Sequence, residues 1–223
     1  MTRLTPIESR VLGVLVEKAQ TVQSQYPLTL NALVTGCNQK SNRDPELNLT
    51  ENDVQEALDG LRGKNLVREV HLSGSRVPKY RHVARETLNL DTAQLVLLAE
   101  LLLRGPQTLG ELRNRATRMH PLESLDVVEA ALDHLMSRDE PLVRRLPAGP
   151  GSRADRYAQL LCPDLHSIDA PTASAPARPI SPASPDAGTA DLLERVQQLE
   201  AELCSLRDAV RRLTDSLGDT TGA

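Results

Sequence analysis

The sequence contains no phenylalanine and no tryptophan, and it has only three tyrosines among its 223 residues. Aromatic rings supply the flat surfaces on which proteins stack bases and sugars, so a binding site built on stacking is disfavoured. Hydrophobic residues nevertheless make up 39% of the chain. The core is therefore expected to consist of leucine, valine and alanine, which suit closely packed helices.

Cysteine is scarce as well, and the three that occur, Cys37, Cys162 and Cys204, lie far apart along the chain. None has a partner at the short spacing of a zinc site, and this usage fits reduced, structural thiols better than disulfides. Long apolar runs are also missing. Because no stretch approaches the roughly 20 apolar residues of a membrane span and no signal peptide is recognisable, we expect a cytoplasmic protein without metal, disulfide or membrane contact.

The motifs of common enzymes do not occur in the sequence. There is no Gly-rich phosphate-binding loop, no nucleophile elbow and no paired-histidine helix motif. Gly74 and the glycines at 149–151 stand where turns between strands are expected. We therefore predict a non-catalytic binding protein, with no catalytic residue, no cofactor and no small-molecule substrate.

A strong excess of positive charge is missing too, since the net charge is −4. Residues 1–86 carry 12 basic and 10 acidic groups, residues 87–165 carry 9 and 11, and residues 166–223 carry 5 and 9. Proteins that bind nucleic acid usually show a larger positive excess. This balance weakens, without excluding, an interaction with DNA.

What the sequence does contain is an internal repeat. Residues 54–61, VQEALDGL, match residues 128–135, VEAALDHL, and LVR at 66–68 matches LVR at 142–144 in the same order. Tyr80 precedes Tyr157 by 77 residues. Similarity that keeps its order along the chain indicates two copies of one structural unit.

Each copy is expected to contain three helices followed by two short strands. The first and second helices are predicted at residues 4–20 and 28–37, and at residues 90–104 and 108–116. The third helices are predicted to begin at Thr50, in a capping box with Asp53, and after Ser124. The strand pairs are predicted at residues 67–72 with 77–83, and 142–146 with 156–160. Three helices and a hairpin wing in this order are typical of a winged helix, the alternative being another small α+β domain.

The last part of the chain has a different composition. Residues 167–190 contain five prolines among small polar residues, which predicts a disordered linker. Beyond it, leucine and valine follow an unbroken heptad spacing that is typical of a parallel two-stranded coiled coil. We expect a homodimer through this coil, the alternative being a helix that folds back on the repeats. The predicted dimer contacts are Leu192, Val196, Leu199, Leu203, Leu206, Val210 and Leu213.

These patterns together predict a mainly α protein with small β-hairpin wings, an α+β class. Its parts are tandem winged-helix repeats, a linker and a C-terminal coiled-coil helix. Their predicted bounds are residues 1–86 and 87–165 for the repeats, 166–190 for the linker and 191–218 for the coil.

One stretch of the first repeat is distinctive. Residues 26–33, YPLTLNAL, followed by residues 37–45, CNQKSNRDP, resemble the signature of the YceH family of uncharacterised bacterial proteins. The resemblance extends over both repeats, roughly residues 4–160. It implies a tandem winged-helix fold and an unassigned function.

Basic residues concentrate on the predicted wings and on the loop at residues 38–45, whereas the third helices are rich in carboxylates. Carboxylates are repelled by a phosphate-lined groove, so groove insertion of a third helix is disfavoured. Two interpretations of the basic residues are left: the wings bind phosphates from outside the groove, or the charges protect exposed strand edges from pairing. The candidate phosphate or partner contacts are Gln39, Lys40, Arg43, Arg68, Arg76, Lys79, Arg81, Arg144, Arg145 and Arg153.

The loop at residues 38–45 has two possible interpretations. Its polar side chains readily bond nearby backbone, which predicts a rigid structural loop. Alternatively it forms a recognition surface with Gln39, Lys40 and Arg43 pointing outward. For the whole protein, the expected function is a DNA-associated regulator that uses its wings, and the alternative is a scaffold whose winged helices bind another protein.

Overall fold

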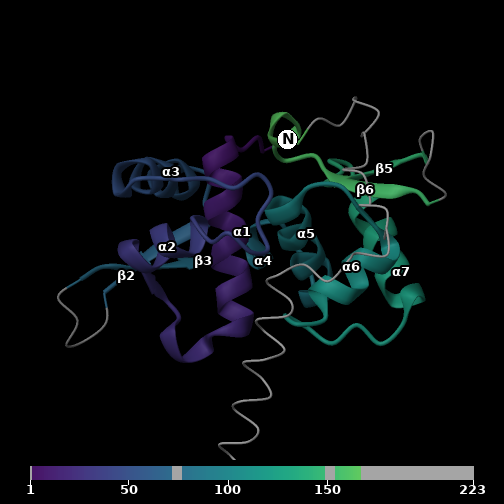
Figure 1. The fold of residues 1–223 in the computed structure, drawn as a ribbon, viewed down its shortest axis with the longest axis horizontal. Helices are drawn as coiled ribbons and strands as arrows, with labels where there is room; N and C mark the ends of the chain where they lie inside the picture. The colour runs from purple at the N-terminus through teal and green to yellow at the C-terminus, as the bar shows by residue number, and fades with distance from the viewer. Residues whose placement is uncertain (1, 72–76, 149–153, 167–223) are drawn as a thin grey trace, which may run out of the picture. The chain divides into compact units, whose positions relative to one another are not determined.

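The computed structural model describes residues 2–71, 77–148 and 154–166 (Figure 1). These residues belong to one compact unit. Arg76, Arg153 and the predicted coil at residues 191–218 lie outside the described residues, as does the predicted linker except for its first residue. That residue, His166, contacts Asp44 in the compact unit, since its Nε2 lies 2.7 Å from the Asp44 carbonyl oxygen.

The first repeat runs from helix to sheet. Its elements are α1 (Pro6–Thr21), the 3-10 helix η1 (Gln23–Gln25), β1 (Leu28–Thr29), α2 (Leu30–Cys37), α3 (Glu51–Gly63), β2 (Val67–Val70) and β3 (Lys79–His82).

The second repeat has the same order of elements after a short connecting helix, α4 (Ala84–Thr87). Its elements are α5 (Thr92–Arg104), β4 (Gln107–Thr108), α6 (Leu109–Ala116), α7 (Leu125–Met136), β5 (Val143–Leu146), β6 (Arg156–Gln159) and the 3-10 helix η2 (Pro163–Leu165). The protein is thus mixed α+β, with small antiparallel sheets.

Local side-chain caps determine where the helices begin. At the start of α1, the Thr5 hydroxyl accepts from the Glu8 N–H, and the Glu8 carboxylate accepts from the Thr5 N–H. Such caps satisfy backbone donors that no helical carbonyl reaches. Equivalent capping boxes begin at Thr50, Asp91 and Thr108. The predicted starts of the third helices at Thr50 and Ser124 are confirmed.

Each sheet has three strands, in the orders β1-β3-β2 and β4-β6-β5. Both predicted hairpins are present, although their strands are shorter than expected. The predicted second helices began too early, because Leu28–Thr29 and Gln107–Thr108 are extended and pair with β3 and β6. A two-residue strand carries no alternating hydrophobic pattern, so sequence periodicity does not reveal it.

The core is centred on the packing of α1 against α5, the first helices of the two repeats. Every residue from Glu8 to Glu17 of α1 is buried, and so is every residue from Leu95 to Leu103 of α5. The helices approach closely at Gly13, where a Cβ atom would lie 2.9 Å from Leu103 Cγ. The two repeats therefore share one core, which explains the unusually wide apolar stripes of both helices.

His82 at the end of β3 is a partly buried titratable group. Its backbone N–H donates to the Tyr26 hydroxyl at 2.7 Å, and the two rings are 6.1 Å apart between centroids. Its Nδ1 has no hydrogen-bond partner among the described residues. Burial lowers the pKa of His82 to about 4.

This lowered pKa predicts a pH dependence of stability. Between pH 6.5 and about 4 the unfolded chain binds a proton at His82 that the folded chain does not bind, so stability falls as pH falls through this window. We expect His82→Gln to reduce that loss by on the order of 1–2 kcal/mol. Urea unfolding at pH 7 and pH 4.5 measures it, with His134→Gln on the exposed face of α7 as control. Identical pH profiles for the wild type and His82→Gln would refute the assignment.

Candidate functional site

The loop between α2 and α3 is held rigidly in place. The Asn38 side chain donates to the Leu49 carbonyl and accepts from the Leu49 N–H, which ties the two ends of the loop together. The Asp44 N–H donates to the Leu103 carbonyl of α5, and the buried Arg10 donates to the Pro45 carbonyl. These bonds support the prediction of a rigid structural loop. The loop also contacts α5 and so connects the two repeats.

Arg43 does not point outward as expected, because the residue is only 6% exposed. Its Nη1 and Nη2 donate to the two Glu17 carboxylate oxygens at 3.2 and 2.6 Å. Nε donates to the Gly36 carbonyl, Nη1 also to the Asn42 carbonyl, and Nη2 also to Gln39 Oε1. A bidentate interaction with a carboxylate, together with the surrounding oxygen acceptors, satisfies the N–H donors of the guanidinium without water. Arg43 is consequently a structural residue and not a free contact for a partner.

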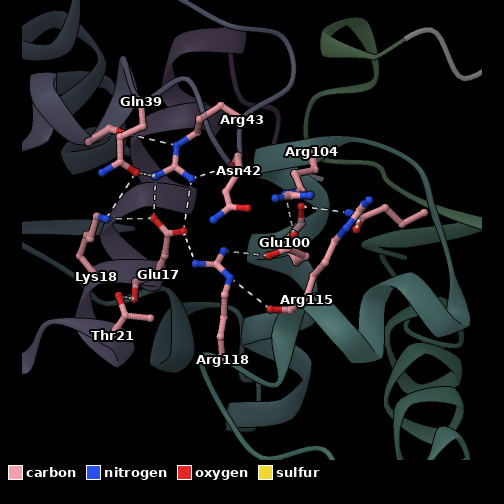
Figure 2. Close-up of polar contacts among 12 residues, drawn as sticks. Glu17, Lys18, Thr21, Gln39, Asn42, Arg43, Glu100, Arg104, Arg115 and Arg118 are labelled. Atoms are coloured by element: carbon pink, nitrogen blue, oxygen red, sulfur yellow. Dashed lines mark hydrogen bonds and ion pairs between the residues drawn. The ribbon is translucent and has the colours of Figure 1, made fainter. Parts of the chain in front are cut away.

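A second buried carboxylate, Glu100, occupies the corresponding place in the second repeat. Glu17 and Glu100 each lie four residues before the end of their helix, and they are 1% and 0% exposed. Arg118 joins them, with Nη1 2.6 Å from Glu17 Oε1 and Nη2 3.1 Å from Glu100 Oε2. Figure 2 shows Arg43 and Arg118 meeting at Glu17, with Glu100 between Arg118 and Arg104.

The arginines favour the charged form of Glu17. Burial by itself raises the pKa of Glu17, but the hydrogen bonds and charges of Arg43 and Arg118 outweigh it and hold the pKa below its ordinary value. Burial also lowers the pKa of Arg118, and its bonds to Glu17 and Glu100 more than compensate. A network of two carboxylates and at least two guanidiniums therefore lies between the repeats.

A small cavity opens beside this network. It has a volume of about 190 Å³ and is lined by Asn42, Arg43, Asp44, Arg104 and Arg115. Arg115 donates to Gln107 Oε1 at 2.7 Å and more weakly to Glu111, and Arg104 Nε lies 3.1 Å from Glu100 Oε1. The cavity is thus lined by three arginines, one asparagine and one aspartate, which come from both repeats.

Sequence reasoning missed the residues of this network apart from Gln39 and Arg43. A signal was present, because Glu17 and Glu100 each interrupt a long apolar stripe near the end of a first helix. Charged residues almost never occupy fully buried positions unless they are paired. The recurrence in both repeats was the clue that these carboxylates have buried partners.

The other predicted contacts lie apart from the network. Gln39 is partly buried in it, whereas Lys40 is exposed. On the outer face of the first sheet, Arg68 and Arg81 are exposed and stand directly opposite each other in the β2–β3 register, next to the partly exposed Lys79.

In the second sheet, Arg144 and Arg145 are exposed, but Arg145 forms an ion pair with Asp155 at 2.6 Å. The two hairpins therefore differ, because the second has an arginine that is paired with a carboxylate.

The third helices expose acidic faces, as their sequences indicate. On α3 the exposed carboxylates are Glu51, Glu56 and Asp59. The exposed face of α7 differs because it also carries Leu125 and Val127, which are 45% and 42% exposed beside Asp126.

A cleft of about 530 Å³ lies beside α7 and is bordered by the β5–β6 hairpin and the start of α6. Its lining includes Leu109, Glu129, Arg145 and Tyr157.

Within the described ranges there is no group of three or more side chains arranged to hold a metal ion. None of the helices described here has both the length and the apolar character needed to cross a membrane.

Comparison with known proteins places the chain in a family. The family profile described as "Protein of unknown function, DUF480" matches residues 4–165. A UPF0502 protein of Acidovorax sp. (strain JS42) is 47% identical over 96% of this chain and 94% of its own length. UPF0502 proteins of Geobacter sulfurreducens and Geotalea daltonii are 49% and 56% identical, over 91% and 70% of this chain and 90% and 72% of theirs. The membership predicted from residues 26–45 is confirmed, and the chain belongs to the DUF480 family of uncharacterised bacterial UPF0502 proteins.

Proposed function

We propose that this chain is a non-catalytic binding protein made of two winged helices in tandem, and that the second of them docks a protein partner through α7. The order helix, strand, two helices and two strands supports the winged-helix assignment, since it occurs in both repeats. In both sheets the first strand pairs with the third, as a winged helix requires. Winged helices occur in both DNA-binding and protein-binding proteins, so the choice between these two functions rests on the residues exposed at the surface.

The exposed face of α7 is the observation that carries the proposal. Leu125 and Val127 are two of the three exposed large hydrophobic residues in the described part of the chain, and they lie in the first turn of one helix. Apolar side chains grouped in this way mark protein contacts more often than isolated ones do. The adjoining Asp126 and Glu129 repel phosphate and attract cations. The partner is therefore a protein segment that combines apolar and basic side chains.

The cleft beside α7 extends this surface. Leu109 and Tyr157 contribute apolar walls, while Glu129 contributes charge. In the first repeat, the Tyr80 hydroxyl donates to Gln55 on α3 at 3.3 Å. At the matching position of α7 stands Glu129, and no hydrogen bond joins it to Tyr157 among the described residues. At this position the second repeat thus carries a carboxylate where the first carries an amide that is hydrogen-bonded to its tyrosine.

Site-specific photocrosslinking tests the proposal. A photoreactive residue at Val127 is expected to form a covalent adduct with a protein in cells that normally make this chain. The same probe at Glu56, on the exposed face of α3, serves as the matched control and should give no such adduct. Leu125→Lys, which adds a cation to the apolar patch, should abolish the Val127 adduct. Equal adducts at both positions, or none at Val127, would rule out α7 as the docking surface.

Nucleic acid is the second candidate, and one observation favours it. Like charges directly opposite each other on neighbouring strands are destabilising, and Arg68 and Arg81 have no ion-pair partner among the described residues. An anionic backbone lying across β2 and β3 would relieve this repulsion. The test is binding to mixed duplex DNA at several salt concentrations. If the wild type binds in a salt-sensitive way and the double variant Arg68→Gln, Arg81→Gln does not bind, the partner is nucleic acid and not a protein.

A further inference from the structure

We propose that the cavity between the two repeats, lined by Asn42, Arg43, Asp44, Arg104 and Arg115, binds a small oxyanion, namely a phosphate group. This site is separate from the α7 surface and does not depend on the protein-docking proposal. The side chains that would donate to it are Asn42 in the loop after α2, Arg104 at the end of α5 and Arg115 on α6, so an anion held there would contact both repeats.

Hydrogen-bond donors around this cavity outnumber the acceptors within reach. Arg43 is saturated by Glu17, Gln39 and backbone carbonyls. Arg104 differs, because its Nε lies near Glu100 without forming a hydrogen bond, and its Nη atoms have no acceptor among the described residues. A guanidinium carries five N–H donors, so most of those on Arg104 are available.

Two further side chains add donors to the same wall. Arg115 uses Nη1 for Gln107 and Nη2 for Glu111, at 2.7 and 3.4 Å, and Nε makes no hydrogen bond within the described ranges. The Asn42 side-chain amide also makes no hydrogen bond to any described residue. Arg104, Arg115 and Asn42 together supply the planar and directional N–H groups that recognise phosphate oxygens.

The carboxylates nearby occupy only some of these donors, since Arg104 reaches Glu100 through Nε and Arg115 reaches Glu111 through Nη2. Glu17 is occupied by Arg43 and Arg118, and Glu100 is bonded to Arg118 and forms an ion pair with Arg104 through Nε. Asp44 lines the cavity, yet it forms no ion pair with Arg104 or Arg115 among the described residues. Burial lowers the pKa of Arg104, and the charges of Arg115, Arg118 and Arg43 lower it further against the opposing effect of Glu100. An added anion would therefore be stabilised at this point.

The size of the cavity selects a small ligand. Its volume of about 190 Å³ lies below the roughly 300–1,000 Å³ of pockets that enclose drug-sized molecules. The walls are almost entirely polar, so an apolar ligand has no favourable surface. A single phosphate group, either free or on a small phosphorylated molecule whose remainder extends into solvent, fits both properties.

A pair of matched variants tests the site. Asn42 and Asn89 both adopt left-handed backbone conformations, with φ of 59° and 49°, which aspartate tolerates as well as asparagine does. Asn42→Asp places a carboxylate on the cavity wall at almost constant size, whereas Asn89→Asp makes the same change outside the cavity. Phosphate binding should weaken by about tenfold or more in Asn42→Asp, equivalent to roughly 1.4 kcal/mol, and stay unchanged in Asn89→Asp.

The measurement is calorimetric titration of the full chain with inorganic phosphate and, separately, with glycerol 3-phosphate, at ionic strength balanced with sodium chloride. Tighter binding of inorganic phosphate assigns the free ion, and tighter binding of the ester assigns a phosphorylated small molecule. Arg115→Gln, which removes the charge and most of the donors of this side chain, should also lose phosphate binding. It takes the place of Asn42→Asp in the test if that variant proves unstable. The proposal is overturned if neither ligand binds to the wild type, or if Asn42→Asp and Asn89→Asp bind equally.

Discussion

Replacing Glu17 by alanine is expected to destabilise the fold by about 3–5 kcal/mol, because the change leaves a buried cation without its partner. The Arg43 side chain is 0% exposed, and both of its Nη atoms donate to Glu17. Arg118 loses its 2.6 Å contact with the same carboxylate. Water does not reach the Arg43 guanidinium in the folded state, so the lost bonds are not replaced.

Urea unfolding of the variant and the wild type measures this loss. Glu56→Ala removes an exposed carboxylate from α3 and is the matched control, for which we expect a change within about 0.5 kcal/mol. The double variant Glu17→Leu, Arg43→Met should recover much of the stability, because an apolar pair avoids the unpaired charge. If Glu17→Ala were no less stable than Glu56→Ala, the network would contribute nothing to the fold.

Replacing Gly105 by alanine is expected to cost about 3 kcal/mol or more. Gly105 ends α5 with φ 75° and ψ −158°, a conformation that is essentially restricted to glycine. A Cβ atom there would also lie 2.5 Å from Cδ2 and 2.8 Å from Cγ of the His166 ring. The ring would have to move, which breaks the contact between His166 and the Asp44 carbonyl.

Thermal or urea unfolding distinguishes this effect from a general cost of replacing glycine. Gly63→Ala is the matched control, since Gly63 is the last residue of α3 and an added Cβ there meets nothing within 4 Å. Alanine has the higher helix propensity, so the control is expected to be neutral or to gain up to about 1 kcal/mol. Equal stabilities for the two variants would show that the backbone at Gly105 is not constrained.

Most of the local structure could be predicted from the chain. Thr50 and Ser124 marked the third helices because a capping hydroxyl acts on a backbone N–H three residues away. The candidate site could not be predicted in the same way. Arg43 was interpreted as an outward contact because its neighbours in sequence are polar, yet its carboxylate partner lies 26 residues away on α1.

The sequence by itself therefore determined the repeat, the starts of the third helices, the two hairpins and the family, since each depends on short-range chemistry or on similarity along the chain. Tertiary structure alone decided three further features: the packing of α1 on α5, the pairing of β1 and β4, and the partners with which Glu17, Arg43 and Glu100 are buried. The physical reason is that burial and pairing depend on contacts between distant segments. The identity of a charged residue in the sequence does not reveal whether its side chain contacts water or another buried charge.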